Sequence, residues 1–245
     1  MIHQIEIAGR VMKVKDTSDS EHRPSIGNDA PHAHWCMKRT DAFVELEAFK
    51  RVCQRVGKVK SVFEMFGGSG WHSNLIQKYC EPQRHMAVDI NEDCVESIHM
   101  SLPLVDAIRA DSYAFLKATN QEFTWIHADF NCFTFNKAEA AGKDGERYSR
   151  ALHHIFKKSE RFATITDSAI FGLKRFEKNR QSYGIKDWRE YYGNAAGAFA
   201  EKWGYAVKHI VIWKWMAAMF LLEKDAEHGF EIEIVSEQIP HRRLA

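Results

Sequence analysis

The sequence predicts a three-layer α/β domain, in which helices cover both faces of a mostly parallel, seven-stranded sheet with an antiparallel end. Three observations support this prediction. Short apolar runs alternate with segments of helical periodicity from residue 42 to residue 213. A glycine-rich turn, Gly67-Gly68-Ser69-Gly70, joins the first of these runs to a helix. Acidic residues stand at or near the carboxyl ends of four successive strands.

The chain has the size and composition of one globular unit. Its 245 residues, 45% of them hydrophobic, suffice for a single large core. A formal charge of +1 excludes a global field that would attract nucleic acid or membrane, so any polyanion site must be a local patch. The five cysteines form no Cys-x-x-Cys pair, which fits reduced thiols. Because neither a membrane-length apolar run nor a signal peptide is evident, we expect a cytoplasmic protein.

Residues 1–40 read as an N-terminal extension to a domain that spans 41–245. Weak alternation of apolar residues over 2–15, centred on Gly9, favours a β-hairpin, and the polar stretch that follows favours a loop. His32-Ala-His34-Trp35-Cys36 offers three metal-binding side chains at a spacing of two, but no fourth ligand is evident. We therefore interpret this segment as a loop with an anchoring tryptophan and expect no metal.

The elements of the main domain follow from residue 42. Thr40-Asp41 and Asn91 cap helices, whereas Gly57, Pro82 and Pro103 end them. Phe230 to Val235 alternates and predicts a further, half-exposed strand. The predicted helices are 42–56, 71–80, 92–101, 148–158 and 188–203, and the strands are 60–66, 86–90, 106–110, 123–129, 162–167, 205–213 and 216–223.

The acids at the strand ends are Glu64, Asp89, Asp111 and Asp129. In an open parallel sheet these ends face one crevice, where ligands bind. Asp89 lies 19 residues after Gly70 and is suitably placed for the hydroxyls of a ribose. Asp111, one strand further on, is suitably placed for an adenine amino group. Each acid alone also fits an exposed strand end, but four in register with a glycine turn favour an adenosine-type ligand.

The acid at Glu64 bears on which adenosine ligand fits. A carboxylate at the mouth of the crevice would repel the pyrophosphate of a dinucleotide such as NAD. It would suit the cationic amino acid end and sulfonium of S-adenosylmethionine. We therefore favour S-adenosylmethionine as the cofactor.

The segment from Val62 to Gly70 resembles the first motif of class I S-adenosylmethionine-dependent methyltransferases, which have a Rossmann-like fold. Its Phe66-x-Gly68-Ser69-Gly70 form is similar to that of many methyltransferases acting on DNA and RNA bases. The resemblance covers about residues 42–223. It implies a cofactor site made of Glu64, Phe66, Gly68, Ser69, Gly70, Asp89, Ile90, Asp111 and Ser112.

Residues 128–133 fall where the family has its fourth motif. The resemblance implies that Asp129 or Asn131 accepts hydrogen bonds from the target group and turns its lone pair toward the methyl. Phe130 or Phe133 would stack on a flat substrate, or alternatively belong to the core. Both prolines of the usual motif are missing, and Cys132 lacks the preceding proline of a carbon-5 cytosine methyltransferase.

A basic and aromatic segment, 171–192, follows the strand at 162–167. Its cations, among them Lys174 and Arg175, alternate with aromatic residues, a mixture that suits phosphates and stacked bases. The alternative is a solvated connection leading into a helix. The polar stretch 136–147 has the composition of a lid.

Four functions therefore compete. The first is a methyltransferase acting on a nucleic acid base, which we favour. The second is a methyltransferase for a small molecule or a protein side chain, consistent with the near-neutral charge and the missing prolines. The third is a non-catalytic subunit of this fold that pairs with an active partner; as to assembly, we expect either such a partner subunit or a homodimer. The fourth is a nicotinamide-dependent oxidoreductase, which Glu64 and the absent third glycine disfavour.

Overall fold

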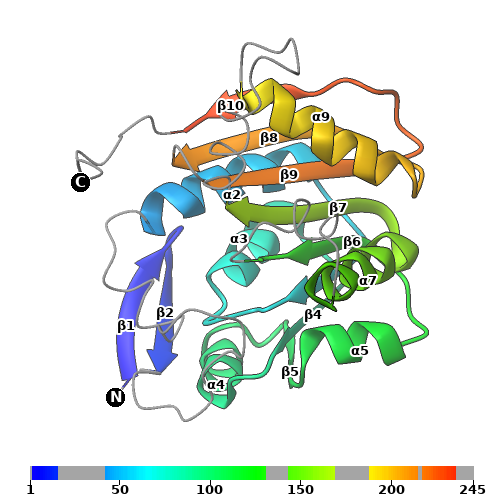
Figure 1. Ribbon diagram of the computed structural model, residues 1–245. Coiled ribbons are helices and arrows are strands. Elements are labelled where there is room, and N and C mark those ends of the chain that lie inside the picture. Colours follow the sequence, from blue (N-terminus) through cyan, green and yellow to red (C-terminus); the bar gives the residue numbers. More distant parts are fainter. Residues whose placement is uncertain (1, 16–41, 131–142, 169–187, 215–216, 236–245) are drawn as a thin grey trace, which may run out of the picture.

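The computed structural model describes residues 2–15, 42–130, 143–168, 188–214 and 217–235 (Figure 1). An eight-stranded sheet runs through the molecule in the order β10-β8-β9-β7-β6-β3-β4-β5. Its strands are β3 (Ser61–Met65), β4 (Arg84–Asp89), β5 (Asp106–Arg109), β6 (Phe123–Ala128), β7 (Ser159–Ser168), β8 (Tyr205–Lys214), β9 (Ala217–Lys224) and β10 (Glu231–Ile234).

The topology confirms the predicted fold class. The chain runs outward from β3 through β4 to β5 and then returns to place β6 on the other side of β3, parallel to it. The strand order therefore reverses at β3, which is where open α/β sheets bind ligands. β9 is antiparallel to both β7 and β8, as expected for the antiparallel end. The 230–235 strand adds an eighth strand, because β10 pairs in parallel with β8 at the sheet edge.

Helices cover both faces of the sheet (Figure 1). One face packs on α2 (Ala42–Val56), α3 (Trp71–Cys80) and α4 (Glu92–Ser101), and the other packs on α5 (Ser112–Ala118), α7 (Lys143–Lys158) and α9 (Trp188–Glu201). Asn91 caps α4 by accepting a hydrogen bond from the Asp93 backbone N–H, as predicted. The short helix α5 was not expected. Its signal is Asp111, whose side chain accepts from the Ala114 N–H at 2.8 Å.

The predicted N-terminal hairpin is present as β1 (Ile2–Ile7) and β2 (Arg10–Lys15), paired antiparallel. Ala8 and Gly9 both have positive φ, 54° and 84°, as a two-residue hairpin turn requires. The hairpin packs on α4, where the backbone N–H of Lys13 donates to Ser101 Oγ at 2.8 Å. Met12 is fully buried there and joins the core beneath α2, α3 and α4.

Several predicted features lie outside the described residues. These are the histidine and cysteine segment at 32–36, Asn131 and Phe133, most of the stretch 136–147, and most of the basic segment, including Lys174 and Arg175. Among the described residues, no helix has both the length and the apolar character needed to cross a membrane.

Candidate functional site

The glycine turn follows β3 at the point where the strand order reverses. Its backbone takes positive φ at Phe66 (60°), Gly68 (51°) and Gly70 (83°). A Cβ at Gly70 would lie 2.9 Å from Ile98 of α4, so the turn presses directly on that helix. A Cβ at Gly68 would instead meet nothing closer than 3.9 Å. The backbone at Gly68 is therefore open to close approach by a ligand.

Phe66 has an uncommon conformation for a bulky residue, and a hydrogen bond to the first residue of α5 holds it there. Its backbone N–H donates to Ser112 Oγ at 3.2 Å, and that hydroxyl donates to the Val88 carbonyl at 2.7 Å. Ser112 is buried at the start of α5. Ser112 thus connects the turn after β3 to the end of β4 and to α5, and its expected contact with a cofactor stays a prediction.

Asp89, at the end of β4, faces the turn as predicted. One of its oxygens accepts from the Gly68 N–H at 2.9 Å, and the other accepts from the Asn91 N–H at 2.8 Å. These two bonds fix the carboxylate at the end of β4, directly beside the turn. The next residue, Ile90, is 46% exposed and gives the site an apolar surface beside the carboxylate.

Ser69, the remaining residue of the turn, is buried, and its hydroxyl has no hydrogen-bond partner within the described part of the chain. Buried polar atoms are normally satisfied, so this hydroxyl is available to a group that enters the turn. Asp111 is exposed at the start of α5, and one of its oxygens serves as the helix cap. Its expected contact with an adenine amino group would use the other oxygen.

The expected position of Glu64 at the mouth of the crevice is wrong. Its side chain is 1% exposed and points toward α3, where Ser73 Oγ donates to Oε2 at 2.5 Å. His85 Nε2 lies 3.1 Å from the same oxygen, and His85 Nδ1 lies 3.0 Å from Gln77 Nε2. An imidazole protonated at Nε2 satisfies both contacts. Glu64 thus joins β3, β4 and α3 from within the core.

Asp129 follows β6 and stands on the other side of β3 from Asp89. Thr166, on β7, donates to Asp129 Oδ1 at 2.5 Å. The adjacent Phe130 is only 9% exposed, which supports the alternative that its ring belongs to the core. It packs edge-on against Phe66, with ring centroids 5.4 Å apart, and Phe66 is the ring that stays 38% exposed. Phe66 is therefore better placed than Phe130 to meet a flat ligand.

The sequence interpretation missed a set of buried polar residues beneath this site. His127 of β6 is fully buried, and its Nε2 lies 3.0 Å from Nδ1 of His72 on α3. His72 Nε2 in turn lies 3.6 Å from Glu45 of α2. Burial, together with His72 and His85, lowers the pKa of His127 well below its usual value. The only sequence signal for this set is His127, a histidine within a predicted strand, and a strand pattern does not indicate that His72 lies beside it.

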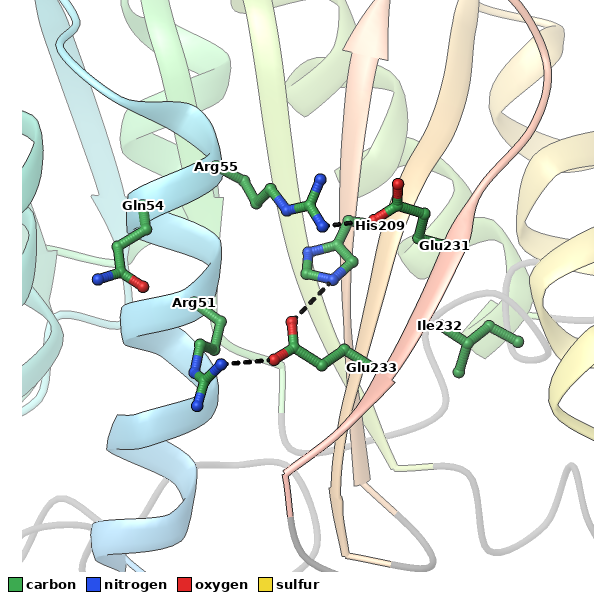
Figure 2. Close-up of a pocket in the computed structure, with 7 residues that line it drawn as sticks. All are labelled: Arg51, Gln54, Arg55, His209, Glu231, Ile232 and Glu233. Carbon is green, nitrogen blue, oxygen red and sulfur yellow. Dashed lines mark hydrogen bonds and ion pairs between the residues drawn. The ribbon is translucent and has the colours of Figure 1, made fainter.

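A hollow of about 460 Å³ lies elsewhere, at the opposite edge of the sheet between α2 and β10 (Figure 2). Its charges pair with one another: Arg51 with Glu233 at 2.8 Å, and Arg55 with Glu231. His209, 2% exposed, lies 3.2 Å from Glu233. Three strands, β9, β7 and β6, separate the strands of this hollow from β3 and its glycine turn, so we regard the side chains of the hollow as the attachment of β10 to α2.

No protein-family model and no curated protein matches the sequence. Solved structures do match. The N-methyltransferase NodS of Bradyrhizobium japonicum WM9, in complex with S-adenosyl-L-homocysteine, has a TM-score of 0.56 and 10% identity over 82% of this chain and 94% of that chain.

Two further structures give similar values. Magnesium protoporphyrin IX methyltransferase of Synechocystis PCC 6803, with bound S-adenosylhomocysteine, has a TM-score of 0.51 and 10% identity, covering 81% of this chain and 90% of that chain. TYW2 of M. jannaschii, in complex with S-adenosylmethionine, has a TM-score of 0.50 and 14% identity, covering 91% of this chain and 86% of that chain. Likeness at these identities concerns architecture. The chain has the Rossmann-like fold that these methyltransferases share.

Proposed function

We propose that the protein is an S-adenosylmethionine-dependent methyltransferase whose acceptor is a base in nucleic acid. One observation carries the proposal: the open glycine turn after β3 lies between Asp89 at the end of β4 and Asp129 after β6. In a sheet whose order reverses at β3, these ends border the crevice where a nucleoside binds. The fold, which methyltransferases share, agrees with this assignment.

The residues present fit the cofactor. Asp89 lies beside the turn, where a carboxylate can meet ribose hydroxyls, Ile90 offers an apolar surface to the adenine, and Gly68 lets a ligand approach the backbone. Ser69 contributes a buried hydroxyl with no partner in the described chain. When bound, S-adenosylmethionine supplies a methyl group on a sulfonium, which is already a good leaving group. Glu64 is bonded inside the core, so it does not meet the cofactor directly in this arrangement.

Asp129 would orient the acceptor. Its Oδ1 is already bonded to Thr166, so Oδ2 is the atom that would accept an N–H of the acceptor amino group. Such a bond turns the nitrogen lone pair toward the methyl, and alignment of this kind accounts for much of the rate of a displacement. The exposed ring of Phe66 gives a planar acceptor a surface on which to stack.

The form of the first motif and the composition of the 171–192 segment favour a nucleic acid base as acceptor. A small planar molecule is the second candidate, because the formal charge is +1 and the described chain pairs exposed arginines such as Arg109 and Arg161 with carboxylates. Paired arginines contribute little to a phosphate-binding surface.

Calorimetric titration with S-adenosylmethionine, and with NAD as the competing cofactor, tests the class. We expect micromolar binding of S-adenosylmethionine alone. Asp89→Ala should weaken that binding by about 1–3 kcal/mol, because hydrogen bonds to a charged acceptor are lost. Asp89→Asn, which keeps one acceptor oxygen for the turn, should lose less. Asp106→Ala is the matched control, since this exposed acid begins β5 and lies at the other end of the strands. Unchanged affinity of Asp89→Ala for S-adenosylmethionine would show that Asp89 does not bind the cofactor.

Labelled-methyl transfer to denatured DNA, total RNA and a metabolite extract tests the acceptor. Asp129→Ala should leave cofactor affinity unchanged and reduce turnover about 100-fold, the cost of a misaligned acceptor. If methyl label appears in the metabolite extract alone, the acceptor is a small molecule and not a nucleic acid base. Full activity of Asp129→Ala would show that Asp129 does not orient the acceptor.

A further inference from the structure

Thr166 lies at the carboxyl end of β7, beside Asp129, and is only 2% exposed. Its hydroxyl oxygen is 2.5 Å from Asp129 Oδ1, 3.3 Å from the Phe130 carbonyl and 3.4 Å from the Ala128 carbonyl. A hydroxyl has one hydrogen to donate. That hydrogen goes to Asp129, because the distance is the shortest and the acceptor is a carboxylate, which forms the stronger bond.

We propose that Thr166 is a positioning residue, which fixes the Asp129 carboxylate so that Oδ2 faces the acceptor. The inference rests on the proposed function. Among the described residues, Thr166 is the only one with a hydrogen bond to the Asp129 side chain, so it alone sets the rotation of the carboxylate. Without it the carboxylate would turn freely about its last bond, and only a fraction of its orientations would present an oxygen to the acceptor.

The strands give this contact its rigidity. Ala128 is in register with Ile165 on the parallel neighbour, which places Asp129 beside Thr166. Threonine is branched at Cβ and therefore has a restricted χ1. Two residues earlier on β7, Thr164 Oγ1 accepts from Nε1 of Trp125 on β6 at 2.7 Å. Two threonines of β7 thus each bond to a side chain on β6 or directly after it, but only Thr166 does so at the site.

This repetition supplies a matched control. Thr166→Val keeps the shape and removes the hydroxyl. We expect it to reduce kcat about 10-fold, equivalent to one hydrogen bond to a charged group, with the Kd for S-adenosylmethionine unchanged. Thr166→Ser should restore most of kcat. Thr164→Val removes the acceptor of a buried indole, so it should lower the melting temperature and leave kcat as in the wild type. Activity is measured with labelled S-adenosylmethionine and the acceptor pool that the wild-type protein labels.

A double-mutant cycle separates positioning from general damage. In the Asp129→Ala background, Thr166→Val should cause no further loss of kcat, because the group that it positions is gone. Independent losses would overturn the inference, as would full kcat in Thr166→Val alone or equal losses of kcat in Thr166→Val and Thr164→Val.

The hydrogen bond between Thr166 and Asp129 can also be tested without an activity assay, by proton NMR. A hydroxyl proton held in a short, buried bond exchanges slowly with water, so the wild-type protein should show a low-field signal that is absent from both Thr166→Val and Asp129→Ala. No such signal in the wild type would overturn the pairing itself. The signal together with wild-type protein that labels no acceptor would overturn the proposed function, and with it the positioning role. Label in the wild type with undiminished kcat in Thr166→Val would overturn this inference alone.

Discussion

Both faces of the sheet bury an apolar core, but the face covered by α2, α3 and α4 also buries polar and ionisable side chains, whereas the face covered by α5, α7 and α9 buries mainly apolar ones. Residues of β3 illustrate the contrast: Glu64 points toward α3 and bonds to Ser73 and His85, while the adjacent Phe63 and Met65 point into the other core. The buried polar side chains of the first face include Glu64, Ser73, His85, His72, His127, Trp125 and Thr164.

The two cores differ in what they specify. Apolar packing contributes in proportion to the area buried and tolerates substitutions that conserve volume. A buried polar network stabilises only the arrangement in which every partner is matched. Glu64 bridges β3, β4 and α3, the three elements that flank the glycine turn. On the first face, Glu64 therefore links the elements around the turn in addition to apolar packing, whereas the second face is held mainly by apolar packing.

The largest expected effect comes from Glu64→Leu. It leaves the Ser73 hydroxyl and the His85 N–H buried without an acceptor, and breaking a buried pair of this kind costs about 3 kcal/mol or more. Urea unfolding measures the loss. Met65→Leu is the control, because it changes the next residue on the opposite face at nearly constant volume and should cost less than about 1.5 kcal/mol. Similar losses in the two variants would contradict the difference between the faces.

Acid should weaken the first face in particular. Burial lowers the pKa of His127, so the folded state resists protonation while the unfolded chain protonates near pH 6.5. The contribution of His127 is complete above pH 6.5 and is lost as the pH falls toward the folded pKa, by at most about 1.4 kcal/mol per pH unit.

His127→Gln removes this titration, so its unfolding free energy should fall less steeply between pH 7 and pH 5 than that of the wild-type protein. Burial also lowers the pKa values of His209 and His154, so the unfolding free energy of the variant should still decrease as the pH falls. Parallel slopes for the two proteins would show that His127 does not titrate in this range.

The smallest effect is expected at the sheet edge of the first face. Arg51 bonds to Glu47 on its own helix and to Glu233 on β10, but it is 44% exposed. Arg51→Ala should cost less than about 1 kcal/mol, and added salt should reduce the difference. Arg150→Ala on α7 is the control, because within the described part of the chain Arg150 pairs with a carboxylate of its own helix, at 3.9 Å. We expect no measurable change there. A loss above 2 kcal/mol in Arg51→Ala would mean that β10 depends on this single pair.

The sequence predicted the order of elements well because periodicity, capping residues and glycine or proline stops are local signals. The hairpin over 2–15, the helix over 42–56 and the strand at 230–235 all follow from residues close together in the chain. Asp89 was also predictable, since its distance from the glycine turn is a property of the β-α-β unit.

Contacts between elements were not predictable in the same way. Glu64 carried the expected charge in the expected strand, yet its direction depends on Ser73 and His85, which other elements bring to it. The His72 and His127 pair joins residues 55 positions apart, and no local pattern indicates such a pair. Thr166 was overlooked because threonine is ordinary in a strand, and its partner becomes visible only when β6 and β7 are paired.

The docking of the hairpin on α4 has a consequence for synthesis of the protein. Ser101, to which Lys13 bonds, is synthesised 88 residues after Lys13. At about 5–20 residues per second, the surface of α4 that helps to bury Met12 is completed several seconds after the hairpin segment has been made. During translation, the apolar side chain of Met12 therefore stays without this part of its core until α4 has been synthesised.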